Sequence, residues 1–215
     1  MNEWRDQALR DGTKGGRRLI YFHGAPGGPG EAALFDDLAR EAGVELICPD
    51  RFALAPGAGA AEVFDRLADQ VRELARTGPL ELAGFSLGGF AALQVCARLG
   101  NEVARLHLIS AAAPLEAGRF LEDMAGRPVF LAAKVSPIGF RLLTAWQGWL
   151  ARRAPQALHQ LLFTAAAGAD RALAQSAHFK ASVWPALSGS LNRPRRRAYR
   201  QEVATYVRPW ADDLA

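Results

Sequence analysis

Cysteine is scarce in this sequence of 215 residues, which contains only Cys48 and Cys96, both in apolar stretches. Two such cysteines do not make the disulfide framework of a small secreted domain, so we interpret them as buried reduced thiols. The polar N-terminus has no apolar segment typical of a secretory signal, and no apolar run approaches the roughly 20 residues that span a bilayer. The sequence therefore predicts a cytoplasmic protein with no membrane partner.

Lysine is also scarce, because the 26 basic residues include lysine only at positions 14, 134 and 180. The formal net charge is +4, and the arginines are spread along the chain, so we predict no nucleic-acid partner. One dense cluster, RPRRR at residues 193–197, is predicted to be a solvated loop, with binding to an anionic partner as the alternative.

Metal-ligand clusters and a phosphate-binding loop are missing as well. The glycine-rich segment 24–30 lacks the Gly-Lys-Ser/Thr ending of a P-loop, and no cluster of His, Cys, Asp and Glu has metal-ligand spacing. The sequence therefore predicts no metal and no cofactor.

Half of the residues are hydrophobic, which is enough for one sizeable core. Four short apolar runs, at residues 18–23, 44–48, 80–85 and 103–109, are candidate strands. Segments with helical period lie between them. Short buried strands alternating with helices predict an α/β fold with a parallel sheet and flanking helices.

Three of the loops that follow these strands carry unusual residues. They are HGAPGGPG at 23–30, PDR at 49–51 and GFSLGG at 84–89. Ligands of parallel sheets bind outside the carboxyl ends of the strands, so we expect these loops to line one crevice.

The pattern G-x-S-x-G around Ser86 favours a nucleophilic serine on a tight strand-to-helix turn. Such a turn leaves no room for side chains two residues before and after the serine, and these positions are Gly84 and Gly88. The backbone N–H of Leu87 would point at an oxyanion formed beside Ser86. We expect the second oxyanion donor to be the N–H of Ala25 in the first loop.

Together, the HGxPG, PDR and G-x-S-x-G-G motifs resemble those of the α/β-hydrolase superfamily, near its proline iminopeptidase-like and esterase-like branches. The resemblance covers about residues 17–112. It implies that Ser86 is the nucleophile and that Ala25 and Leu87 form the oxyanion hole. It also implies that His23, Gly24 and Gly27 form the loop beside the substrate, with His23 bracing that loop.

Residues 113–210 have a different composition, which is rich in alanine, leucine and arginine. They resemble the helical cap of that superfamily, which divides the chain into a core at 1–112, a cap at 113–210 and the start of a further core segment at 211–215. Breaks between cap helices are expected at Pro128, Pro137, Pro155, Gly168, Pro185 and Pro194. The cap aromatics either line an apolar pocket or pack the cap onto the sheet; they are Phe140, Trp146, Trp149, Phe163, Phe179 and Trp184.

The sequence departs from the superfamily at its C-terminal end. No acid after a late strand and no C-terminal histidine can be matched, and the last histidine is His178, inside the cap. An internal set, Glu116 or Asp123 with His178, is a weaker candidate because cap helices do not fix a base with the required accuracy. By the same resemblance, Asp50 and Arg51 fix loops. We expect the chain to lack its acid and base.

The predicted function is a serine hydrolase acting on an ester or amide of a small apolar substrate, truncated and inactive as it stands. The alternative is a non-catalytic, hydrolase-like protein that binds a small apolar ligand or a protein partner. A third hypothesis is a complete enzyme in which another chain supplies the catalytic histidine. Neither the acyl group nor the oligomeric state is predicted.

Overall fold

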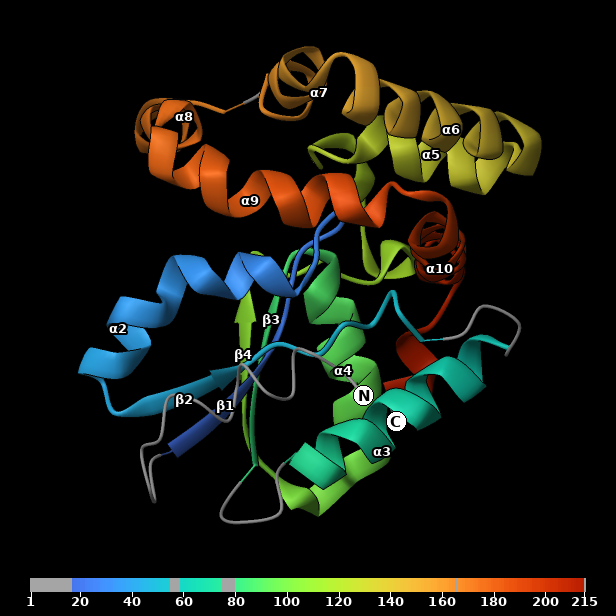
Figure 1. Ribbon diagram of the computed structural model, residues 1–215. Helices are drawn as coiled ribbons and strands as arrows, with labels where there is room; N and C mark the ends of the chain where they lie inside the picture. Colours follow the sequence, from blue (N-terminus) through green and yellow to red (C-terminus); the bar gives the residue numbers. More distant parts are fainter. Residues whose placement is uncertain (1–16, 55–58, 75–79, 165, 215) are drawn as a thin grey trace.

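A parallel sheet of four strands forms the centre of the molecule in the computed structural model (Figure 1), which describes residues 17–54, 59–74, 80–164 and 166–214. The spatial order is β2-β1-β3-β4, and all neighbouring pairs are parallel. This confirms the α/β fold with a parallel sheet. The strands are β1 (Arg17–Phe22), β2 (Val44–Ile47), β3 (Leu80–Phe85) and β4 (Val103–Ile109).

Helices cover both faces of this sheet because successive strand residues point to opposite sides. Ile20 and Phe22 pack into the larger core with α3 (Ala60–Leu74) and α4 (Leu87–Leu99). Tyr21, between them, packs on the other face against Ala32. That face is covered by the 3₁₀ helix η1 (Pro29–Phe35) and by α2 (Asp36–Glu41).

Strand β4 is the edge of the sheet in the described part of the chain, where it pairs with β3 alone. Its side chains are exposed towards its carboxyl end, with Leu108 49% and Ile109 47% accessible. Such an edge offers unpaired backbone groups to another strand.

The chain after β4 is helical and lies over the carboxyl ends of the strands (Figure 1). Pro137 and Pro155 begin helices, as first-turn prolines do. The elements here are η3 (Leu115–Ala117), η4 (Phe120–Glu122), α5 (Arg127–Val135), α6 (Pro137–Arg153), α7 (Pro155–Leu162), α8 (Gly168–Gln175), α9 (Ala177–Ser190), α10 (Arg193–Tyr206) and η5 (Ala211–Leu214); η2 (Gly100–Glu102) precedes β4.

Two predictions for this region are wrong. Pro185 does not break a helix, because α9 runs through it to Ser190 and is held by packing on η1, where Gly28 and Gly30 approach Ala186. The predicted loop at residues 193–197 is the first turn of α10. A proline near the start of a helix lacks an N–H that would have no intrahelical partner, so the RPRRR cluster fits a helix start.

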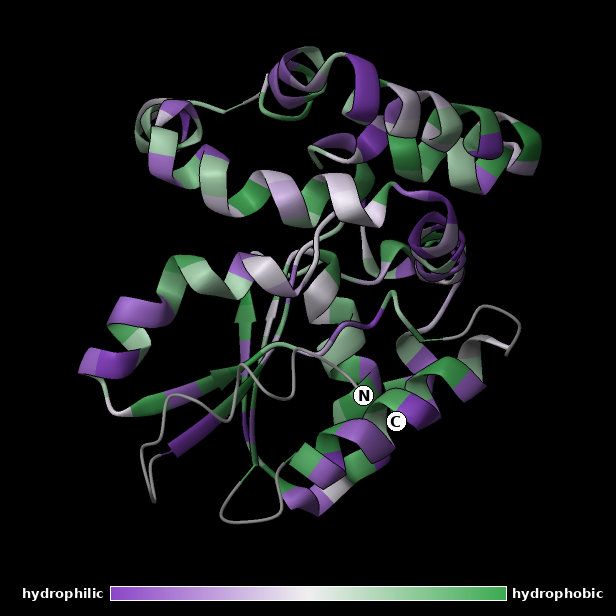
Figure 2. Cartoon of the chain, in the orientation of Figure 1, coloured by the Kyte–Doolittle hydropathy of each residue, from purple (hydrophilic) through white to green (hydrophobic). Residues whose placement is uncertain are grey.

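Figure 2 shows hydrophobic residues concentrated on the strands and on α4, which packs against both the sheet and α3. The aromatic residues of the predicted cap differ in their burial. Phe140 is buried and Phe163 packs edge-on against Phe179, whereas Trp146 and Trp149 are 46% and 50% exposed on α6. About half of each of these two tryptophan side chains is therefore open to solvent. Among the described residues, no helix has the length and apolar character needed to cross a membrane.

Candidate active site

The turn between β3 and α4, residues 84–89, is called the serine turn below. Ser86 sits between the last strand residue, Phe85, and the first helical residue, Leu87. Its backbone has φ 54° and ψ −124°. A positive φ is uncommon for a residue with a side chain and costs on the order of 1–3 kcal/mol, so the surrounding structure must hold it.

Glycines make this turn sterically possible. A Cβ built on Gly84 would lie 2.5 Å from the carbonyl oxygen of Gly88. A Cβ built on Gly88 would overlap the carbonyl oxygens of Phe22 and His23, at the end of β1. The serine turn therefore touches the start of the first loop, as the sequence predicted for loops at the carboxyl ends of neighbouring strands.

Backbone hydrogen bonds fix Ser86 in place. Its N–H donates to the carbonyl of Ile109 at 3.1 Å, and its own carbonyl accepts from the N–H groups of Gly89 and Ala112, both at 2.9 Å. The side chain is half-buried. Leu87 is the first residue of α4, and N–H groups at the start of a helix favour a negative charge nearby.

The loop that follows β1, residues 23–30, is called the HG loop below, and its second residue is held from two sides. Gly24 N–H donates to Glu31 Oε1 at 3.1 Å, and the same oxygen accepts the Tyr21 hydroxyl at 2.5 Å. The Gly24 carbonyl accepts from His23 Nδ1 at 2.7 Å. Ala25 comes next, before a cis peptide bond to Pro26. Gly27 leaves no room for a Cβ, which would lie 2.6 Å from the Gly24 carbonyl oxygen.

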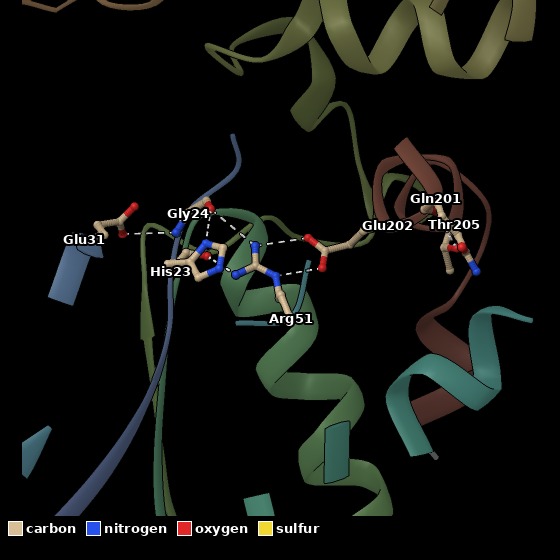
Figure 3. A network of polar contacts seen from close by, with 7 residues as sticks. All are labelled: His23, Gly24, Glu31, Arg51, Gln201, Glu202 and Thr205. Carbon is tan, nitrogen blue, oxygen red and sulfur yellow. Dashed lines mark hydrogen bonds and ion pairs between the residues drawn. The ribbon is translucent and has the colours of Figure 1, made fainter. Parts of the chain in front are cut away.

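Arg51 connects the HG loop to helix α10 (Figure 3). Its Nη1 donates to the carbonyl of His23 at 2.6 Å, and its Nη2 lies 3.4 Å from the carbonyl of Gly24. The same guanidinium makes two bonds to the Glu202 carboxylate, of 2.7 and 3.1 Å. Burial raises the pKa of Glu202, and the charge of Arg51 opposes that rise.

Asp50, the other charged residue of the PDR motif, pairs with Arg195 at 2.5 Å. Both charged residues of the motif therefore bind residues of α10, in addition to the bonds of Arg51 to the HG loop. Loop fixing by these two residues was predicted, whereas their partners on α10 were not.

His23 is fully buried and packs edge-on against Phe52, with ring centroids 5.2 Å apart. A carbonyl can only accept, so Nδ1 carries the proton in the bond to Gly24. Burial, together with the charge of Arg51, holds the pKa of His23 well below its usual value of 6.5. The ring is therefore a neutral donor that braces the HG loop, which is the role the sequence favoured for it.

The lowered pKa of His23 predicts a specific pH dependence of the free energy of unfolding. Below pH 6.5 the unfolded chain protonates His23 and the folded chain does not, so stability falls by up to about 1.4 kcal/mol per pH unit as the pH decreases. In His23→Asn, this contribution to the slope should disappear. Urea unfolding of both proteins between pH 7.5 and 5 measures it.

The exposed His178→Asn serves as the matched control, because it should keep the wild-type slope. If His23→Asn also keeps that slope, the buried neutral state of His23 is refuted.

The internal acid and base candidates lie elsewhere. Glu116 Oε1 accepts the N–H groups of Trp210 and Ala211 at 2.6 and 2.7 Å. Although burial opposes it, these two bonds lower the pKa of Glu116. The carboxylate thus holds the segment after α10 and is not free to orient a base. Asp123 and His178 are exposed.

The two remaining histidines also have other surroundings. His107 lies 3.7 Å from Glu81, and His159 packs against Phe163 with ring centroids 4.6 Å apart. Within residues 17–54, 59–74, 80–164 and 166–214, no hydrogen bond joins Ser86 Oγ to a histidine or a carboxylate. The same residues contain no group of three His, Cys, Asp or Glu side chains placed to hold a metal ion.

Two residues of the site were not predicted from the sequence. Glu31 follows a glycine-rich segment with no motif of its own, and Glu202 is 151 positions away from Arg51. A signal for Glu202 did exist, since it is the one acidic residue of α10 and follows a run of arginines. That pattern draws attention to the Glu202 carboxylate but does not predict which residue it binds.

Comparisons with known proteins identify a family and a fold for this chain. The sequence profile of the thioesterase domain family matches residues 17–185. No curated protein sequence matches the chain. Several solved structures are similar, including the three that follow, and the chain spans a little over half the length of the first two.

The first is the thioesterase domain of NocB in a covalent complex with a fluorophosphonate nocardicin G analogue. It has 28% identity and a TM-score of 0.39, over 51% of this chain and 54% of that one. The second is a probable hydrolytic enzyme from Pseudomonas aeruginosa, with 18% identity and a TM-score of 0.50, over 90% and 58%. The third is Cfl2 from Burkholderia cenocepacia, with 21% identity and a TM-score of 0.49, over 86% and 68%.

The sheet order, the tight turn at Ser86 and the likeness to the Pseudomonas structure define an α/β-hydrolase fold. Within that superfamily, the chain belongs to the thioesterase domain family. The motifs had indicated the superfamily but not this branch of it.

Proposed function

We propose that the chain carries the nucleophile and oxyanion hole of a serine hydrolase that cleaves a small apolar ester or thioester. The observation that supports this most directly is the conformation of Ser86. A serine held at φ 54° between a strand and a helix, with glycines where side chains would collide, is costly to maintain. Such a turn is useful because it presents the hydroxyl to a substrate carbonyl.

In the proposed reaction, Ser86 Oγ attacks the carbonyl carbon and the carbonyl oxygen becomes an oxyanion. The N–H groups of Leu87 and Ala25 bind this oxyanion, and one such donor is worth about 3–4 kcal/mol in the transition state. The bond to the alcohol or thiol breaks as the acyl–Ser86 ester forms, and the leaving group takes up the proton lost by the Ser86 hydroxyl. Water then hydrolyses this ester, which releases the carboxylic acid and restores the Ser86 hydroxyl. His23, Glu31 and Arg51 act indirectly, by holding the loop that presents Ala25.

A general base for Ser86 is not found among the described residues. We therefore expect the chain as given to react once with an activated reagent and to turn over slowly. Without its base, a serine hydrolase keeps roughly 10³–10⁴-fold acceleration over water from the oxyanion hole and binding. A base from another chain, or from sequence beyond this one, would restore turnover.

Labelling with a fluorescent fluorophosphonate tests the nucleophile. Wild type should gain one reagent mass, and Ser86→Ala should gain none. Ser110→Ala is the matched control, because Ser110 directly follows Ile109, the backbone partner of Ser86, and should label like wild type. Labelling that persists in Ser86→Ala rejects Ser86 as the nucleophile.

The second candidate is a non-catalytic binding protein of the same fold. It is favoured by the lack of a base beside Ser86 in the described part of the chain and by the exposed edge at β4. No labelling of a folded wild-type protein, combined with no hydrolysis of p-nitrophenyl butyrate, supports this candidate over the first.

A further inference from the structure

A groove separates the α5–α6 helix pair from α10, away from the serine turn, and has a cavity volume of about 840 Å³. Its walls come from the end of α5, the start of α6, the outer side of α10 and the residues that follow α10. Figure 1 shows α10 lying beneath the α5–α6 pair. The groove is called the basic groove because of five lining residues, Lys134, Arg141, Arg197, Arg200 and Arg208.

None of these five cations forms an ion pair with a described residue. Some arginines elsewhere are paired, as Arg72 is with Glu102 and Arg98 with Asp65. Others, such as Arg152 and Arg153, form no ion pair with a described residue, so it is the clustering of the five cations in one groove that sets them apart. The groove contains no carboxylate, because α5 and α6 have no acidic residue. The one acidic residue of α10, Glu202, binds the buried Arg51 on the inner side.

The cations of the basic groove also act on one another. Burial lowers the pKa of Arg200, and the charges of Arg196, Arg141 and Arg197 lower it further. Like charges brought together without counterions destabilise the folded state, and a bound anion would remove that cost.

The shape and the lining residues of the basic groove indicate which class of anion fits it. A volume of about 840 Å³ lies within the roughly 300–1,000 Å³ of small-molecule sites. Guanidinium groups bind phosphate oxygens in pairs, and several around one concavity suit more than one phosphate. Between the cations lie apolar residues that reach the surface, Pro137, Ala204 and Pro209, which suit an organic moiety. A bilayer surface is flat and would not fill this concavity.

We propose that the basic groove binds the oligophosphate group of a soluble, nucleotide-sized ligand. Arg141 from α6 and Arg200 from α10 clamp the phosphates from opposite walls, and the apolar residues contact the organic part. This site is independent of the hydrolase reaction proposed for Ser86, since it uses none of the same residues.

Titration calorimetry at fixed ionic strength tests the proposal with two probes, inorganic tripolyphosphate and ADP. Both should bind wild type at one site. The double variant Arg141→Gln/Arg200→Gln should weaken binding by on the order of 100-fold in Kd, because it removes two charge-assisted contacts and each contributes about a factor of ten.

The matched control is Arg66→Gln/Arg105→Gln, which removes the same net charge from exposed positions on α3 and β4, two elements that do not line the groove. It should change Kd by less than about threefold, since distant exposed charges are largely screened. Circular dichroism checks that both double variants remain folded.

Three results would overturn the proposal. One is no binding of either probe to folded wild type. Another is equal weakening in the two double variants, which means general attraction to a basic protein. The third is binding of phosphatidylglycerol vesicles or a DNA duplex that is lost in Arg141→Gln/Arg200→Gln while neither soluble probe binds. That result would assign the groove to a macromolecular surface.

Discussion

Replacing Glu202 by alanine is expected to lower the free energy of unfolding by about 3–5 kcal/mol. Arg51 and Glu202 are both buried, with side chains 1% and 9% exposed, and their two hydrogen bonds satisfy each other. Removing one member of such a pair leaves an uncompensated buried charge, which accounts for a loss of this size. Urea denaturation of the two proteins, followed by tryptophan fluorescence, measures it.

Two further variants separate the buried charge from general effects. Glu122→Ala removes the carboxylate of an exposed pair with Arg119 and should change stability by less than about 1 kcal/mol. Arg51→Met/Glu202→Leu removes both charges and should regain part of the loss. Recovery will be incomplete, because Arg51 also donates to the carbonyl of His23. If Glu202→Ala matches Glu122→Ala, the ion pair contributes little to folding.

The same variants also test whether Glu202 and Arg51 hold the HG loop in place. Glu202 holds Arg51, and Arg51 holds the carbonyls of the two residues before Ala25. Loosening this chain of contacts should slow the fluorophosphonate reaction of Ser86 even in protein that is still folded. Helix α10 thus stabilises the loop proposed to supply an oxyanion donor, although it lies far from that loop in sequence.

The sheet and the serine turn could be predicted because their signals are local. Each strand is a short apolar run, and the glycines of the serine turn stand at fixed distances from Ser86 in the sequence. The steric reason given for Gly84 and Gly88 requires only the geometry of a strand entering a helix, and the structure shows those close contacts. Local patterns of this kind are enough to predict the sheet and the serine turn in the described residues between 17 and 112.

The helical region could not be predicted in the same detail, because tertiary contacts decide its features. Pro185 disrupts a helix locally, yet packing of α9 against η1 carries the helix through it. The arginines at 193–197 look like a solvated loop until Asp50 and the start of α10 are placed beside them. The bond between Arg51 and Glu202 joins residues 151 positions apart, and no periodicity or spacing reports such a contact.

Gly88→Ala is expected to lower the free energy of unfolding by at least about 2–3 kcal/mol and to abolish labelling of Ser86. The added methyl group would overlap the carbonyl oxygens of Phe22 and His23, so backbone has to move on one side of the serine turn. Alanine is the better helix former by up to about 1 kcal/mol, and Gly88 is the second residue of α4. The overlap outweighs this gain, because the obstructing atoms belong to a buried central strand and its loop and not to a flexible side chain.

Gly59→Ala is the matched control for that substitution. Gly59 precedes α3, and a Cβ there meets no atom within 4 Å, so stability should stay within about 0.5 kcal/mol of wild type and labelling should be unchanged. Urea denaturation and the rate of fluorophosphonate labelling are measured for both variants. A Gly88→Ala protein that is as stable as Gly59→Ala and labels at the same rate would contradict the close contact between the serine turn and the HG loop. The geometry proposed for attack by Ser86 would then lose its main support, because that contact brings the serine turn against the start of the HG loop.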